Sequence, residues 1–180
     1  MYQLQEYNIN FKSLKDGKHH FHFSIGQLFF KAVEESIIAD GDFEIEVELD
    51  KKTQMLQLDF NIHGSVKGIC DNCLGALTVP VSYQGAVYVK FGIEYDESNE
   101  EVIVLPQDES KINIAHLIYE YIVVSMPLRS VHEDYKSCDP EMKARLEEFS
   151  GEYHHNDSKE EEITDPRWDA LKKLKYNNNK

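Results

Sequence analysis

The stretch Gly68-Ile69-Cys70-Asp71-Asn72-Cys73-Leu74-Gly75 contains two of the three cysteines in the 180-residue chain. Cys70 and Cys73 are separated by two residues, the shortest common spacing at which one turn supplies two thiolates to a single metal ion. Gly68 and Gly75 bracket the pair, and we expect them to adopt the positive backbone φ angles that direct amide groups toward bound thiolates. The stretch therefore predicts half of a zinc site, placed in a turn.

Two other interpretations of this cysteine pair compete with a metal site. The cysteines can be small hydrophobic residues in an ordinary turn. They can also form a thioredoxin-like redox motif, which needs the start of a helix because the helix dipole lowers the thiol pKa. The following residues, 77–83, are apolar at every second position and include Pro80. That pattern predicts a strand and argues against the redox motif.

The remaining ligands must come from a distant part of the chain. Cys138 is the third thiol, and His132 lies six positions before it. We predict a Cys3His site made of Cys70, Cys73, His132 and Cys138. Four protein ligands leave no position for water or substrate, so the predicted site is structural rather than catalytic. Without Cys138 beside it, His132 would be interpreted as a surface loop histidine.

Composition predicts a globular, intracellular protein. The chain has a mass of 20.9 kDa, 41% hydrophobic residues and 11% aromatic residues, enough for a core without disulfides. The odd cysteine count and the polar first residues, 1–5, predict a reducing cytoplasm and no secretion signal. No apolar run reaches the length of a membrane span. The net charge of −14 opposes contact with a nucleic-acid backbone over most of the surface.

Hydrophobic periodicity predicts an α+β fold. Apolar residues alternate with polar ones in 43–49 and 56–62, on either side of a turn at 50–53. Further strands are expected at 77–83, 86–91 and 102–105, while 95–101 is expected to be an acidic loop. These strands predict a strongly bent antiparallel sheet or small β-barrel. One main helix, 114–126, begins at an Asn113 N-cap, ends at Pro127 and is expected to cover the sheet.

Two more segments are expected at the amino-terminal side. Phe21 and Phe23 indicate a strand, and we interpret His19, His20 and His22 as its solvated surface rather than as a second metal site. Residues 27–36 are compatible with a short helix.

The carboxyl-terminal region is expected to be an appendage. We expect residues 1–151 to form a single α+β domain, 152–163 an acidic linker, and 164–180 a short helix and tail. Arg167, Trp168 and Leu171 are candidate partner-binding residues, because a short amphipathic helix must dock to be stable. Docking on its own domain and docking on a partner both remain open.

The combined motifs resemble those of the YceD family, the large ribosomal RNA subunit accumulation proteins. The resemblance is carried by the Cys70–Cys73 turn, the helix ending in Pro127-Leu128, His132 followed by Cys138, and the terminal motif Asp165-Pro166-Arg167-Trp168. It extends from about residue 43 to the end of the chain. It implies a non-enzymatic bacterial factor needed for 23S ribosomal RNA accumulation and large-subunit biogenesis.

Two functional hypotheses of different classes follow. The first is a binding module with a structural zinc ion, whose partner is a large-subunit precursor, a ribosomal protein or an assembly factor. Basic proteins suit the negative charge better than RNA does. The alternative is a thiol redox sensor or oxidoreductase that uses Cys70 and Cys73. A domain without any metal is a third interpretation. The sequence contains no phosphate-binding loop or hydrolase motif that would indicate other enzymes.

Overall fold

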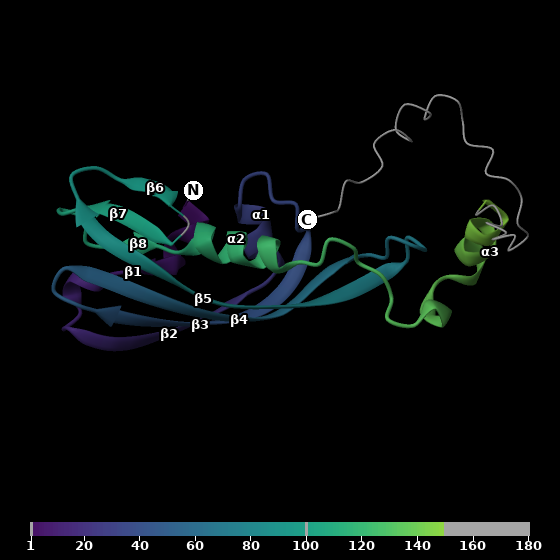
Figure 1. The fold of residues 1–180 in the computed structure, drawn as a ribbon, viewed down its shortest axis with the longest axis horizontal. Coiled ribbons are helices and arrows are strands. Elements are labelled where there is room, and N and C mark those ends of the chain that lie inside the picture. The colour runs from purple at the N-terminus through teal and green to yellow at the C-terminus, as the bar shows by residue number, and fades with distance from the viewer. Residues whose placement is uncertain (1, 100, 150–180) are drawn as a thin grey trace, which may run out of the picture. The chain divides into compact units, whose positions relative to one another are not determined.

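A computed structural model describes residues 2–99 and 101–149 of the chain (Figure 1). The chain divides into two compact units, residues 1–145 and 146–180. The second unit is described only over 146–149, where helix α3 ends, and the linker and terminal helix expected beyond residue 151 lie outside the described residues. The elements are η1 (Tyr2–Tyr7), β1 (Asn8–Ile9), η2 (Phe11–Ser13), β2 (Gly17–Ile25), α1 (Gln27–Ala32), β3 (Asp40–Lys51), β4 (Met55–Ile69), β5 (Ala76–Gly92), β6 (Asp96–Asn99), β7 (Val102–Pro106), β8 (Ile112–Asn113), α2 (Ala115–Ser125), η3 (Tyr135–Ser137) and α3 (Pro140–Phe149).

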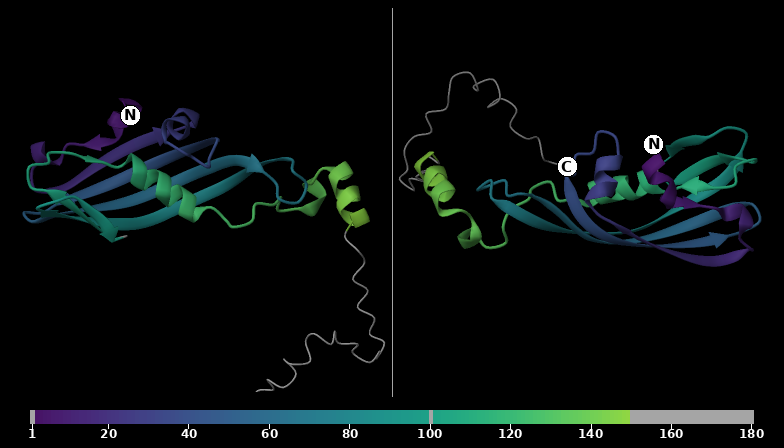
Figure 2. Two further views of the ribbon diagram at one scale, coloured as in Figure 1. Left: turned by 90° about the horizontal axis from the view of Figure 1, so that it is seen from above. Right: turned by 180° about the vertical axis from the view of Figure 1, so that it is seen from behind.

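The first unit is built on a six-stranded sheet with the order β2-β3-β4-β5-β7-β6 (Figures 1 and 2). Within the described residues, β2 and β6 are the two edges and do not pair with each other, so the β-barrel alternative is wrong. Neighbouring strands are antiparallel except β5 and β7, which run parallel. A separate two-stranded ladder joins β1 to β8. The prediction of an α+β fold is confirmed, because the described residues form mainly sheet with a few helices.

The predicted hairpin of β3 and β4 forms the centre of the sheet. Leu49 pairs with Leu58 and Ile45 with Ile62, so the alternation observed in the sequence places both apolar sets on one face. All four side chains are fully buried. The opposite face carries the intervening polar residues, as expected for an antiparallel sheet with one solvated face.

Strand β5 differs from the prediction. The sequence indicated two strands, 77–83 and 86–91, whereas β5 runs without interruption from Ala76 to Gly92. Pro80 is tolerated because β7 pairs only with 88–92, so the half of β5 that contains Pro80 has no second neighbour in the described sheet. Proline lacks the N–H that a central position requires. The predicted acidic loop at 95–101 also contains a short strand, β6.

Helix α2 covers the apolar face, as predicted (Figure 2). Ile118 and Ile122 are fully buried, and the ring of Tyr121 packs 4.3 Å from that of Tyr83 on β5. The side chain of Asn113 accepts a hydrogen bond from the Ala115 N–H at 3.0 Å. It therefore satisfies one of the free amide groups at the helix start. The N-cap position itself is Ile114, without a side-chain cap hydrogen bond, so the prediction of an Asn113 N-cap is wrong by one residue.

The amino-terminal segments complete the core. Tyr7, Phe29 and Phe30 are buried against the sheet, and the first two rings meet edge to face at 5.1 Å. On β2, His20 and His22 lie opposite the glutamates of β3, at 3.5 Å from Glu48 and 3.1 Å from Glu44, with more than half of each side chain exposed. The predicted solvated histidine surface is confirmed for His20 and His22 but is wrong for His19, which is half-buried on the other face of β2, with its Nε2 atom 2.8 Å from the Lys15 carbonyl oxygen. In the described part of the chain, no helix has the length and apolar character needed to cross a membrane.

Candidate metal centre

The cysteine turn, residues 70–75, connects the end of β4 to the start of β5. Cys70 N–H donates to the Gly75 carbonyl and Leu74 N–H to the Cys70 carbonyl, both at 2.8 Å. The positive φ angle falls on Leu74, at 58°, and not on Gly68 or Gly75. The prediction for the two glycines is therefore wrong. The backbone reverses at Leu74, one residue before Gly75, and the Leu74 side chain is 61% exposed.

The segment after α2 is held against this turn by a clamp that sequence analysis missed. Asp71 N–H donates to the Ser130 carbonyl at 2.7 Å, and its carboxylate accepts from Ser130 N–H at 2.6 Å. Arg129 donates to the side chain of Asn72 at 2.6 Å. Asp and Asn between two cysteines are residues that accept hydrogen bonds in turns. These two residue types were the signal available in the sequence. They did not indicate that the hydrogen-bond donors would be Ser130 and Arg129.

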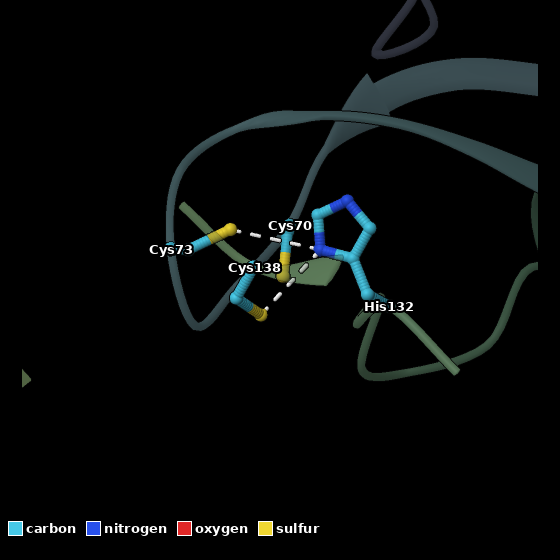
Figure 3. A group of neighbouring side chains, drawn as sticks. All are labelled: Cys70, Cys73, His132 and Cys138. Atoms are coloured by element: carbon cyan, nitrogen blue, oxygen red, sulfur yellow. Dashed lines mark hydrogen bonds between the residues drawn. The ribbon is translucent and has the colours of Figure 1, made fainter. Parts of the chain in front are cut away.

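The clamp brings the four predicted ligands together (Figure 3). The three sulfurs and one ring nitrogen of Cys70, Cys73, His132 and Cys138 lie within 4.8 Å of one another. The cysteines are nearly inaccessible, with exposures of 0%, 2% and 3%, and they are free thiols. The structure thus assembles a group that can hold a metal ion.

Two distances agree with tetrahedral coordination. The Nδ1 atom of His132 lies 3.6 Å from the sulfurs of both Cys73 and Cys138. Zinc bonds of about 2.3 Å to sulfur and about 2.0–2.1 Å to nitrogen, at a tetrahedral angle, separate the two ligand atoms by about 3.5–3.6 Å. One nitrogen can share at most one proton with two sulfurs, whereas a cation at the centre attracts all of them.

The orientation of the His132 ring favours the same role. Its Nε2 atom lies 3.3 Å from the Ala76 carbonyl oxygen. A carbonyl only accepts hydrogen bonds, so Nε2 carries the proton and Nδ1 of the neutral ring presents its lone pair to the sulfurs. Backbone partners of this kind fix the tautomer of metal-binding histidines.

The environment shifts the pKa values of two thiols in opposite directions. Burial disfavours the Cys70 thiolate, but the backbone N–H groups of Cys73, His132 and Asn72 outweigh burial and lower its pKa to about 6. Burial, followed by hydrogen bonding and proximity to Cys73 and Cys70, raises the pKa of Cys138 to about 11. Three neighbouring sulfurs therefore cannot all be anionic by themselves. A divalent cation would stabilise the full set of thiolates.

The cysteines also form a small core of their own. They make a buried cluster distinct from the main core, and Leu77, Val131 and Met142 pack against it. The candidate partner residues Arg167, Trp168 and Leu171 lie outside the described residues.

The structure is a sheet protein in which the turn between β4 and β5 meets the segment after α2 at a Cys3His group. The sequence profile described as "Large ribosomal RNA subunit accumulation protein YceD" matches residues 58–175, so the chain belongs to the YceD family. The match starts within β4 and includes all four clustered residues. Comparisons with curated proteins and with solved structures gave no match. The family name links the protein to accumulation of the large-subunit ribosomal RNA.

Proposed function

We propose that this protein is a non-enzymatic binding module that supports bacterial 23S ribosomal RNA accumulation during large-subunit biogenesis, and that its Cys3His group holds a structural zinc ion. The observation that carries the proposal is the closed group of four buried or half-buried ligands in a chain of the YceD family. Four protein ligands complete a tetrahedron and leave no position for substrate, which is the arrangement of structural zinc sites.

Zinc is the metal that the ligand types favour. Three thiolates and one imidazole are soft or borderline donors, typical of zinc, whereas magnesium and calcium prefer oxygen. The metal would connect β4 and β5 with the loop around residue 130, beside the hydrogen bonds between Asp71 and Ser130. Its role in this proposal is to make a rigid platform.

The partner proposed here is a basic protein of the large subunit, either a ribosomal protein or an assembly factor. A net charge of −14 accelerates encounter with positively charged proteins and opposes encounter with RNA. Precursor RNA would then be reached through that protein. Arg167, Trp168 and Leu171 are further candidate contact residues.

The function is tested in cells that lack the protein. We expect 23S ribosomal RNA and mature large subunits to fall relative to small subunits, and the tagged protein to sediment with large-subunit precursors. Unchanged 23S levels together with no sedimentation at precursor positions would refute the assignment. A variant with Cys70→Ser and Cys73→Ser serves as the test of the zinc ion, because it should retain less than about half an equivalent of zinc.

The lowered pKa of Cys70 is the one observation that favours the alternative, a thiol redox sensor. Reactive thiols must also be accessible, and Cys70 is fully buried. Iodoacetamide labelling distinguishes the two functions. A structural site predicts slow labelling that becomes fast after chelation, whereas a sensor predicts fast labelling of the untreated protein.

A further inference from the structure

A groove runs along helix α2 on the side that faces β5, β6 and β7, elements that can be followed in Figure 1. Its volume is about 820 Å³. A neighbouring cavity of about 530 Å³ shares Glu97, Ile103, His116 and Leu117 with it and continues toward Lys111. We call the larger cavity the α2 groove; the residues that matter here are Tyr83, Glu97, Glu101, His116, Glu120 and Tyr121.

The α2 groove carries carboxylates that no strong cation neutralises. Glu97, Glu101 and Glu120 line it, and none of its described lining residues is a lysine or an arginine. Glu120 contacts His116 at 3.1 Å, and Glu97 accepts a hydrogen bond from Tyr95. The pKa of Tyr121, on the floor, is raised mainly by burial and further by Tyr83, Glu120 and Glu97.

The outer face of the sheet is also acidic, but three of its carboxylates, those of Glu48, Asp40 and Asp42, have lysine partners. Glu48 contacts Lys18, and Lys67 bridges Asp40 and Asp42 at 3.0 and 3.3 Å. The described residues form no comparable pair with lysine or arginine at Glu97, Glu101 or Glu120. The two acidic surfaces therefore differ in their capacity for an added cation.

The floor of the α2 groove is aromatic and apolar. The rings of Tyr83 and Tyr121 stack at 4.3 Å with an angle of 13° between their planes, and Ile103 and Leu117 line the same space. Lysine and arginine side chains place their methylene stems on such surfaces while their charged ends reach polar groups. Aromatic rings add attraction for the cation.

We propose that the α2 groove binds a lysine- and arginine-rich segment of a protein, with apolar stems on the tyrosine floor and cationic ends at Glu97, Glu101 and Glu120. This inference rests on the proposed function, for which it supplies the contact surface on the described part of the chain. Nucleic acid does not fit, because its phosphates would meet the three carboxylates.

The test uses the full chain and a fluorescein-labelled oligo-arginine peptide, with affinity measured by fluorescence anisotropy at about 150 mM salt, where distant charges are screened. The groove variant is E97Q/E101Q/E120Q. The matched control, E44Q/E46Q/E48Q, removes the same charge from the outer face of the sheet. We expect the dissociation constant to rise about tenfold in the groove variant and less than about twofold in the control.

Equal weakening in both variants, no weakening in the groove variant, or no binding to the unaltered protein would each overturn the proposal. Circular dichroism and melting curves check that both variants are folded, which we expect because five of the six substituted side chains are exposed and the sixth, Glu48, is half-buried. The peptide measurement does not depend on ribosomes. A negative result therefore removes the groove alone, whereas the proposed function fails only if 23S levels and sedimentation are unaffected by loss of the protein.

Discussion

At the scale of single residues, the ring of His132 determines whether the cluster is a metal site or merely three thiols. Its Nε2 proton is directed to the Ala76 carbonyl and its Nδ1 lone pair to the sulfurs of Cys73 and Cys138. Residue type and spacing were sufficient to predict that these four residues come together, since thiols are rare in this chain. The Ala76 contact could not be predicted, because it depends on how the β5 backbone begins.

Replacement of the histidine should release the metal. We expect His132→Ala to weaken zinc affinity more than about a hundredfold, because loss of an outer partner alone costs about 10- to 100-fold. The measurement is competition with a chromophoric chelator. His63→Ala, at an exposed position on β4, is the control and should bind zinc as the unaltered protein does. Equal zinc affinity in the two variants would exclude His132 as a ligand.

The glycines of β4 differ sharply in what a side chain would meet. A Cβ at Gly64 would lie 2.2 Å from the Asp42 carbonyl oxygen and 2.5 Å from the ring of Phe43. At Gly68 it would meet nothing within 4 Å. We expect Gly64→Ala to lower the free energy of unfolding by about 1–3 kcal/mol, as measured by urea denaturation. Gly68→Ala should leave it unchanged or raise it slightly. Similar losses in both variants would show that close approach at Gly64 is not the cause.

At the scale of elements, periodicity predicted which residues share a face but not which strands become neighbours. The β3–β4 hairpin was predictable because a short turn fixes the pairing of two alternating segments. The parallel pairing of β5 with β7 was not, because alternation is the same in both directions. Pro80 was predicted to lie within a strand, but the sequence does not show whether a second strand lies beside it, which is a tertiary property that decides whether proline is tolerated there.

Helix α2 should contribute strongly to stability through its buried side. Ile118 is fully buried, whereas Val124 on the same helix is 72% exposed. We expect Ile118→Ala to reduce the free energy of unfolding by about 2–5 kcal/mol, through lost burial and the cavity left behind. Val124→Ala should change it by less than about 0.5 kcal/mol. Thermal or urea unfolding of the two variants tests this, and comparable losses would contradict the assigned orientation of the helix.

At the scale of the first unit, two separate clusters hold the chain. The main core joins the sheet, α1, α2 and the amino-terminal segments, while the cysteine cluster contacts only a few apolar residues. The clamp of Asp71 with Ser130 is the principal hydrogen-bonded link beside it. A cluster of this size has little apolar area of its own to bury, so its stability should depend on the bound ion.

Removal of the metal should therefore loosen one end of the sheet and spare the other. Hydrogen exchange after chelation should be at least about tenfold faster for amides in 70–75 and 130–138, because the ion stabilises only the state that binds it. Amides of Ile45 and Val47 in the main core should keep their protection. His132→Ala without chelator should reproduce this local pattern, which separates metal loss from effects of the chelator. Faster exchange throughout the sheet would mean that the two clusters unfold together, and unchanged exchange at the cysteine turn would mean that the ion does not stabilise it.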